Sequence, residues 1–323
     1  MEKLHKSIYL GGHNSTVPLI KDTEIGYKYF LENAGFRICD TVNQAEAIVF
    51  IEFDDKVASQ APANFPMILI RNEPEIVWPQ NFKSKQLKKV RNFIDVGRMN
   101  ELNEKFVPWP QNWDQVDSQI LPVDKRIERV AVINGNRLSF IKGEQYSFRR
   151  ECIYKISDLD LFGDSWDINL ARKIYLLIAE LYISLKNKYL PNFPSAKFWF
   201  RKPKNYLGSP ESKFQTLNKY KYSLVIENSL DYMSEKLFDV LLARTIPIYV
   251  GPNIELFDIP KNLVVQVESN LNAIKEGIDV AKRMDYTAWS RELNTWLSQE
   301  KNIQKWSAKN VYENISNQIA VLL

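Results

Sequence analysis

The chain has 323 residues, of which 45% are hydrophobic and 25% are charged, and its formal net charge is +4. This composition is typical of a globular protein and excludes a disordered or collagen-like chain, and the length is sufficient for two domains. The small positive charge suits anionic small ligands. A nucleic-acid-binding protein would need basic residues gathered on one face, so we expect no nucleic-acid partner.

Cysteine and histidine are scarce, with two residues of each. Cys39 and Cys152 are far apart and lie among apolar residues, so we expect no disulfide framework and a reducing, cytoplasmic compartment. His5 and His13 belong to no cluster with the spacing of a zinc site, and we predict no metal.

The sequence predicts no membrane-spanning segment. The charged residues 1–6 are followed directly by a strand-like run rather than by the apolar core of a signal peptide. The most apolar long stretch, residues 174–185, is too short to cross a bilayer and is interrupted by Glu180. We expect at most peripheral contact with the inner face of the cytoplasmic membrane.

The first third of the chain alternates short apolar runs with a helical stretch. The expected strands are residues 7–10, 36–39, 47–53 and 66–71, and the expected helix is residues 24–33. Continuous β-rich runs separated by helices are typical of a parallel sheet that is covered on both faces. Residues 74–128 contain several prolines and tryptophans, and we expect them to form a looser segment.

A second series of the same kind begins at Arg129. Its expected strands are residues 129–133, 159–162, 222–226 and 246–250, and its expected helices are residues 148–156, 172–188, 234–242, 271–284 and much of 287–323. We therefore predict an α/β fold with two Rossmann-like domains, residues 1–128 and 129–323, and a cleft between them. Whether the C-terminal helices pack back on the first domain stays open.

The segment 219–252 predicts a ligand site. The strand 222–226 ends in the polar residues Glu227-Asn228-Ser229, and Ser234 is a suitable N-cap for the helix that follows. The next strand ends at Gly251-Pro252. Open α/β sheets bind ligands at such strand ends, and the free amides of a helix N-terminus favour phosphate.

Two charged residues begin this helix. A lysine in the first turn opposes the helix dipole, so the position of Lys236 needs another reason, and a bound diphosphate would supply one. Glu235 could accept hydrogen bonds from ribose hydroxyls. The alternative is that Glu235 and Lys236 simply begin an exposed helix, and spacing alone does not decide between the two.

The segment resembles the signature of the α-1,3-fucosyltransferases. It contains Tyr-Lys-Tyr-Ser-Leu-Val-Ile-Glu-Asn-Ser, then Asp-Tyr-Met-Ser-Glu-Lys-Leu-Phe, then Ile-Pro-Ile-Tyr-Val-Gly, in the order that the family shows. The match covers about 35 residues strongly. It departs from the family pattern at Ile226, where phenylalanine is usual, at Ser234, where threonine is usual, and in a short connection after Ser229.

The resemblance implies a GT-B fold and an inverting, metal-independent transferase that uses GDP-fucose as co-substrate. It assigns donor binding to Asn228, Tyr232, Glu235 and Lys236. A surface glycan, as in polysaccharide or lipopolysaccharide synthesis, is the implied acceptor.

Two further positions fit the family. Arg150, with Arg149 as its rival, resembles the arginine that opens the first helix of the donor domain and holds the diphosphate; a guanidinium can contact two phosphate oxygens at once. Glu73, in Arg71-Asn72-Glu73-Pro74, resembles the family's catalytic base. An exposed turn glutamate before proline is the alternative for Glu73.

Other functions remain open at this point. Asp158-Leu159-Asp160 could be the metal-binding Asp-x-Asp of a metal-dependent glycosyltransferase, although these residues precede a strand rather than follow one. A transferase for a different nucleotide sugar, or a non-catalytic nucleotide- or glycan-binding module, are further alternatives. The sequence does not indicate an oligomeric state.

Overall fold

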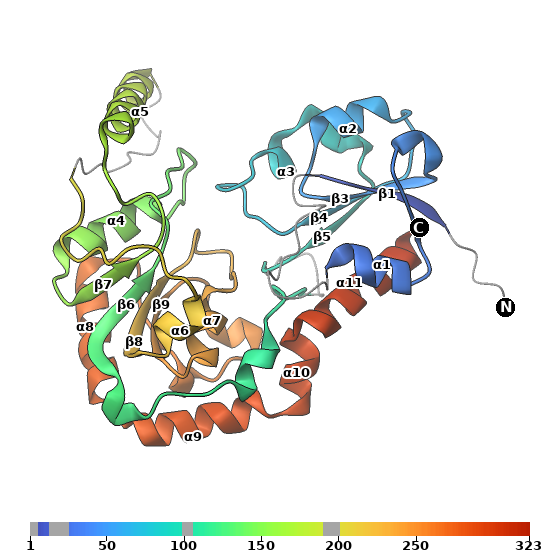
Figure 1. The fold of residues 1–323 in the computed structure, drawn as a ribbon. Coiled ribbons are helices and arrows are strands. Elements are labelled where there is room, and N and C mark those ends of the chain that lie inside the picture. The colour runs from blue at the N-terminus through green and yellow to red at the C-terminus, as the bar shows by residue number, and fades with distance from the viewer. Residues whose placement is uncertain (1–5, 13–25, 99–105, 190–200) are drawn as a thin grey trace. The chain divides into compact units, whose positions relative to one another are not determined.

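The computed structural model describes residues 6–12, 26–98, 106–189 and 201–323 and divides the chain into two compact units (Figure 1). The first unit contains Met1–Trp113 and Gln299–Leu323, and the second contains Asp114–Ser298. The first boundary between the units thus follows Trp113, whereas the sequence predicted a boundary after residue 128. The last 25 residues belong to the first unit rather than to the second.

The first unit is built on a parallel sheet with the strand order β2-β1-β3-β4-β5. Its strands are β1 (Ser7–Gly11), β2 (Arg37–Cys39), β3 (Ala47–Ile51), β4 (Met67–Arg71) and β5 (Asn92–Asp95). Every residue of β3 is buried, as expected for a central strand covered on both faces. The predicted strands are confirmed, whereas β5 was missed because it is short and lies within the segment expected to be loose.

Helices cover both faces of this sheet. They are α1 (Tyr27–Asn33), α2 (Asp55–Gln60), α3 (Gln80–Lys83), α10 (Glu300–Trp306) and α11 (Ala308–Leu322). On one face, α1 and α11 pack together, with the rings of Tyr27 and Tyr312 edge to face at 4.9 Å. On the other face, Ala58 of α2 packs against the alternate side chains of β3 and β4.

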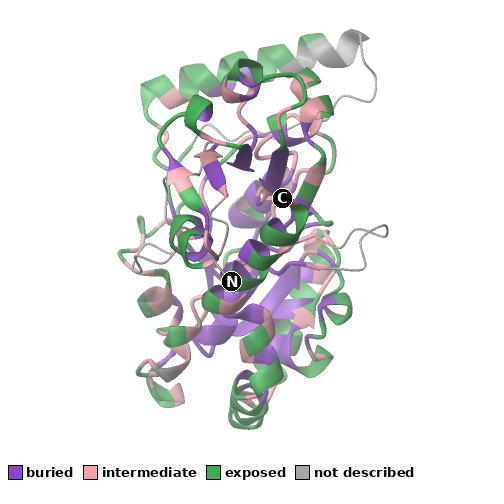
Figure 2. Ribbon diagram, turned by 90° about the vertical axis from the view of Figure 1, so that its right-hand side faces the viewer, coloured by how far each residue is buried: buried purple, intermediate pink, exposed green. Residues whose placement is uncertain are grey.

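The second unit repeats this architecture with the strand order β10-β9-β8-β6-β7, again parallel throughout. Its strands are β6 (Ile127–Ile133), β7 (Leu159–Phe162), β8 (Tyr220–Ile226), β9 (Ile246–Val250) and β10 (Val265–Gln266). Its helices are α4 (Tyr146–Lys155), α5 (Leu170–Tyr189), α6 (Lys213–Leu217), α7 (Lys236–Leu242), α8 (Leu271–Arg283) and α9 (Tyr286–Leu297). The central strands are buried (Figure 2).

The two cysteines, Cys39 and Cys152, are free and buried, one in each unit. Within the ranges that the structure describes, no helix has both the length and the apolar content needed to cross a bilayer.

Candidate functional site

The strand order of the second unit indicates where this fold would place a ligand. Strand β6 is followed along the chain by β7 on one side, whereas β8 and β9 lie on its other side, so the order reverses between β6 and β8. Ligands of open α/β sheets bind beyond the carboxyl ends of the strands at such a reversal. The carboxyl end of β8 leads into Glu227–Ser229, and α4, which follows β6, begins near the same edge, since Gln145 N donates to Asn228 O at 3.0 Å.

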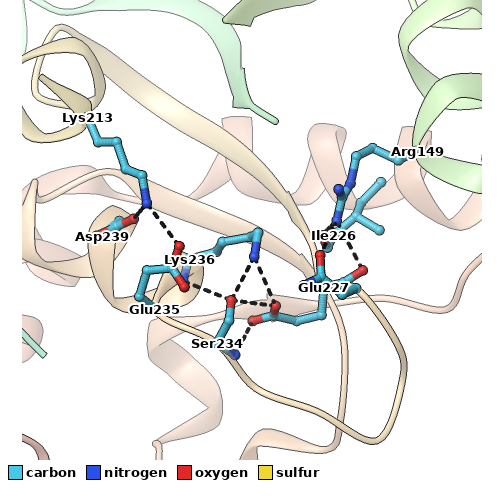
Figure 3. Close-up of polar contacts among 9 residues, drawn as sticks. Arg149, Lys213, Ile226, Glu227, Ser234, Glu235, Lys236 and Asp239 are labelled. Carbon is cyan, nitrogen blue, oxygen red and sulfur yellow. Dashed lines mark hydrogen bonds and ion pairs between the residues drawn. The ribbon is translucent and has the colours of Figure 1, made fainter. Parts of the chain in front are cut away.

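Glu227 organises this strand end (Figure 3). Its carboxylate is fully buried and accepts hydrogen bonds from Ser234 N (3.1 Å) and Ser234 Oγ (2.7 Å). The Lys236 ammonium donates to Ser234 Oγ at 2.9 Å and lies 3.8 Å from Glu227 Oε2. Burial raises the pKa of Glu227, and the nearby Lys236 and the hydrogen bonds from Ser234 oppose that rise.

This arrangement gives Lys236 a partner that the sequence analysis did not consider. Its position against the helix dipole is stabilised by Glu227, so a diphosphate is not the only explanation for a lysine there. Sequence reasoning saw Glu227 only as part of a polar strand end. The sequence feature that could have indicated its role is its position directly after a buried strand, in Glu-Asn-Ser, because an acidic side chain that is buried there needs polar partners.

The predicted helix start is shifted by two residues. Helix α7 begins at Lys236 with Glu235 as its N-cap, rather than at Ser234. Ser234 Oγ still accepts from the amide of Lys236 at 3.3 Å, so it satisfies one free donor of the first turn. Because its hydroxyl also donates to Glu227, Ser234 connects the strand end to the helix start.

Glu235 belongs to a second group of charges, which it forms with Lys213 of α6 and Asp239 of α7. The Lys213 ammonium lies 2.9 Å from Glu235 Oε1 and 2.9 Å from Asp239 Oδ2. Burial alone would raise the pKa of Glu235, but the attraction of Lys213 and Lys236 outweighs it and holds that pKa below its usual range. Glu235 is therefore a carboxylate, which can accept hydrogen bonds, and it is not an unpartnered residue at an exposed helix start.

Glycine is required where β9 ends, beside this network. A Cβ atom at Gly251 would lie 2.3 Å from Tyr249 Oη and 2.9 Å from Cγ of Glu227. Both distances are far below van der Waals contact. Gly251 thus leaves room for the buried Glu227 side chain.

The two candidate arginines of α4 have different surroundings, and both are buried. Arg149 Nη2 donates to Ile226 O (2.5 Å), Glu227 O (3.2 Å) and Asn228 Oδ1 (3.3 Å), so it ties α4 to the end of β8. Arg150 Nη1 donates to Arg137 O (2.5 Å), and Nη2 donates to Ser147 Oγ (3.0 Å). The structure thus brings Arg149 to the strand end that carries Asn228, and places Arg150 beside the connection that follows β6.

The remaining donor-site candidates differ in exposure. Asn228 is half-buried and lies at the end of β8, in contact with Arg149. Tyr232 is only 1% exposed, so its ring lies in the interior of the second unit.

Glu73 lies in the first unit, two residues after β4, and is half-buried. Its amide donates to Glu52 Oε1 at 2.9 Å, as does the amide of Asn72. Glu52 is 1% exposed and has a left-handed backbone with a φ of 63°, which is uncommon for this residue type. Asn81 Nδ2 donates to its other carboxylate oxygen. A buried carboxylate therefore fixes the backbone that carries Glu73, and sequence reasoning did not identify it.

The pKa of Glu52 should make the stability of the first unit depend on pH. Burial raises this pKa to about 7 from its usual 4.5, although hydrogen bonds from Asn81, Glu73 and Asn72 oppose the rise. The folded chain therefore binds the proton more tightly than the unfolded chain. The resulting stabilisation is complete below about pH 4.5 and is lost as the pH rises through about 7. Its full size is about 3 kcal/mol.

Glutamine at position 52 stays neutral at every pH. We therefore expect the melting temperature of Glu52→Gln to exceed that of the wild type by an amount that grows as the pH is raised from 5 to 8, and that reaches roughly 5–10 °C at pH 8. Thermal unfolding at both pH values measures this. The control is Glu32→Gln at an exposed glutamate, whose melting temperature should differ from that of the wild type by the same small amount at pH 5 and at pH 8. A difference for Glu52→Gln that did not change with pH would contradict the prediction.

The alternative metal site lies at the other edge of the second sheet. Asp158 directly precedes β7, and Asp160 is its second residue. Arg129 pairs with both, at 3.6 Å from Asp158 Oδ1 and 2.8 Å from Asp160 Oδ1, and Lys282 pairs with Asp158. Tyr220 Oη also donates to Asp160 at 3.0 Å. These carboxylates therefore have cationic partners of their own and lie away from the carboxyl ends of the strands.

Comparison with known proteins bears on the family. No protein-family model matches the chain. A putative fucosyltransferase-like protein of Arabidopsis thaliana is 38% identical over 79 residues, which are 24% of this chain and 15% of that protein. The match therefore spans a small part of the plant protein.

Solved structures of α1,3-fucosyltransferase cover nearly the whole chain. A crystal structure of α1,3-fucosyltransferase has a TM-score of 0.54 at 13% identity and covers 100% of this chain and 91% of that one. A crystal structure of α1,3-fucosyltransferase with GDP-fucose has a TM-score of 0.51 at 14% identity, with coverages of 98% and 90%. At such identities the likeness concerns the fold. The chain has the α/β architecture of GT-B glycosyltransferases, and its resemblance to the α-1,3-fucosyltransferases is confirmed at that level.

Proposed function

We propose that the chain is a glycosyltransferase that transfers fucose from GDP-fucose to a hydroxyl group of an acceptor glycan. The observation that carries the proposal is the connection from β8 to α7. It has the fucosyltransferase-like sequence, and its charged residues Glu227, Glu235 and Lys236 gather beyond the carboxyl end of β8. The GDP-fucose bound in a structural neighbour, and the fucosyltransferase-like name of the plant relative, support this donor.

The proposed reaction is a single displacement with inversion. The acceptor oxygen forms a bond to the anomeric carbon while the bond from that carbon to the diphosphate oxygen breaks, and GDP leaves. Glu73 takes the proton of the acceptor hydroxyl. Lys236, with Arg150 or its rival Arg149, stabilises the negative charge that develops on the leaving diphosphate, as cationic groups do in phosphoryl sites. Glu235, ionised under the influence of Lys213, accepts hydrogen bonds from the ribose.

Thermal unfolding with different nucleoside diphosphates tests which nucleobase the sugar donor carries. A ligand present at about 100 times its Kd stabilises the folded state by about 2.7 kcal/mol. We expect GDP and GDP-fucose to raise the melting temperature, and UDP and ADP at the same concentration to leave it unchanged. If UDP or ADP alone raised the melting temperature, the proposed donor would be a different nucleotide sugar bound to the same scaffold.

Turnover separates the enzyme from a binding module. We expect GDP release from GDP-fucose in the presence of a suitable glycan, such as a surface polysaccharide or lipopolysaccharide fragment. We propose that no metal takes part, because Asp158 and Asp160 are paired with Arg129 and Lys282 at the opposite edge of the sheet. Turnover should therefore survive EDTA. Binding of GDP without any transfer or hydrolysis would favour the non-catalytic module.

A further inference from the structure

The carboxyl end of β3 carries a glutamate whose placement is unfavourable in two ways. Glu52 directly follows β3 and is 1% exposed, and among the described residues its carboxylate accepts only from neutral donors. Its backbone is also left-handed, with a φ of 63°, a conformation that disfavours residues with a Cβ atom. Strained residues concentrate at functional sites, where the surrounding structure holds them in place. Glu52 is therefore a candidate for a role beyond the packing of the first unit.

The neighbours of Glu52 hold its carboxylate in a defined position. The amide of Glu52 donates to Ile70 O at 3.1 Å, which continues the pairing of β3 with β4 by one residue. The buried Asn81 of α3 donates through Nδ2 to one carboxylate oxygen, and Asn81 Oδ1 accepts from Phe53 N at 2.7 Å. Because Asn81 is itself fixed by the residue that follows Glu52, the two side chains orient each other.

The other carboxylate oxygen holds the connection that follows β4. Oε1 of Glu52 accepts from the amides of Asn72 and Glu73, both at 2.9 Å. Asn72 is buried, and its Oδ1 accepts from Tyr27 Oη at 2.8 Å. Two successive amides on a single oxygen fix the direction in which the chain leaves the strand, and with it the position from which the Glu73 side chain extends.

The charge of Glu52, and not only its shape, matters for this contact. Hydrogen bonds to an ionised carboxylate are roughly twice as strong as those between neutral groups. A neutral glutamine could accept from the same two amides without burial of a charge, and we expect it to make the protein more stable at pH 8. Stability alone therefore does not explain a glutamate at position 52.

The position of a base controls the rate that it supports, and a misplacement of about 1 Å can lower that rate about a hundredfold. We propose that Glu52 is a positioning residue for Glu73, whose ionised carboxylate holds the connection after β4 in the conformation that transfer requires. This role rests on the proposed function of Glu73 as the base.

The pH dependence of Glu52→Gln tests this role. Burial raises the pKa of Glu52 to about 7, so its carboxylate is ionised at pH 8 and mostly protonated at pH 5.5. Tyr27 of α1 stays neutral over this range, because burial raises its pKa well above the usual value. The other charged side chains of the surrounding elements have partners of their own: Arg71 pairs with Asp95, Lys83 pairs with Glu75, Asp54 caps α2, Asp55 accepts from Ser84, and Arg98 lies over the ring of Phe82.

The measured quantity is the ratio of kcat between the wild type and Glu52→Gln. We expect this ratio to be roughly tenfold at pH 8 and less than about twofold at pH 5.5. Both proteins contain Glu73, so the ionisation of Glu73 itself cancels in the ratio. KM for GDP-fucose should be unchanged, because the donor residues lie in the other unit. Since the same variant should melt above the wild type at pH 8, loss of structure would not account for its lower kcat.

Glu46→Gln is the matched control. The carboxylate of Glu46 also accepts from a backbone amide of the first unit, that of Ser7 at 2.8 Å, but Glu46 lies at the amino end of β3. Its kcat should equal that of the wild type at both pH values.

The backbone amide resonance of Glu73 provides a second measurement, which does not depend on turnover. In NMR spectra of the wild type it should shift with a midpoint near pH 7, and in Glu52→Gln this shift should be absent. An amide that did not titrate near pH 7 would overturn the proposal.

The kinetic outcomes are equally decisive. Wild-type kcat in Glu52→Gln at pH 8 would overturn the positioning role alone. A tenfold ratio that persisted at pH 5.5 would also overturn it, because glutamine would then merely disturb the connection. Absence of any transfer by the wild type would overturn the proposed function and this role together.

Discussion

Glu73→Gln should lower kcat by about 10²–10⁴, the range that a general base typically contributes. Glutamine has nearly the shape of glutamate but cannot accept the acceptor's proton at any pH at which the protein is folded. The amide of residue 73 would still donate to Glu52, so the backbone of this connection should keep its conformation. The melting-temperature shift caused by GDP should be unchanged, because the donor residues lie in the other unit.

Glu75→Gln is the control for this variant. Glu75 lies two residues further along the same connection and pairs with Lys83 at the surface, so its substitution should change kcat by less than about twofold. Steady-state kinetics with GDP-fucose and a fixed acceptor separate kcat from KM. Full turnover by Glu73→Gln would remove Glu73 from the reaction and leave the exposed-turn interpretation.

Lys236→Met should have the second largest effect, a decrease in kcat of about 10²–10³, as found when one group that stabilises developing charge is removed. Methionine replaces the unbranched stem of lysine as far as Cε and removes the charged amino group. The affinity for GDP should also fall, because the diphosphate loses a cationic partner. The matched control is Lys275→Met on α8, an exposed lysine whose loss should change neither quantity.

The contact between Lys236 and Glu227 makes a second variant necessary. Removing the ammonium leaves a buried carboxylate without its cation, and this alone could disturb the site. In the double variant Lys236→Met and Glu227→Gln, the buried negative charge is gone as well. If Lys236 acts on the diphosphate, the double variant should regain stability but stay low in kcat. Recovery of kcat together with stability would show that Lys236 serves only to balance Glu227.

Much of the fold could be predicted from the sequence. Residues 47–51 and 66–70 are apolar on both faces, as is typical of strands in a parallel sheet that is covered on both sides, and they form most of β3 and β4. Strand β5 was missed because Asn92 and Asp95 give it little apolar pattern. The domain limits depend on which helices share a core, and the spacing of residues in one chain does not contain that information.

The site was less predictable than the fold. Residues 227–236 were identified because a polar strand end precedes a helix start, and the family resemblance named their roles. The burial of the carboxylates of Glu52 and Glu227, and hence their structural role, was missed, because a glutamate that ends a strand has the same sequence pattern whether it is buried or exposed. Their importance depends on contacts with Asn72, Ser234 and Lys236, which only the folded chain brings together.

The return of the C-terminal segment to the first unit has a consequence for biosynthesis. Gln111 N donates to Trp306 O at 3.0 Å and Ala308 N donates to Gln111 O at 2.9 Å, so the two parts of this unit are separated by the entire second unit in the chain. Once residue 298 has left the ribosome, all residues of the second unit are available for its folding. The first sheet, although synthesised earlier, must wait for Tyr312 and Ile315 before the apolar side of α1 is covered. Until α11 has been synthesised, Tyr27, Phe30 and Leu31 remain an apolar surface through which nascent chains could aggregate.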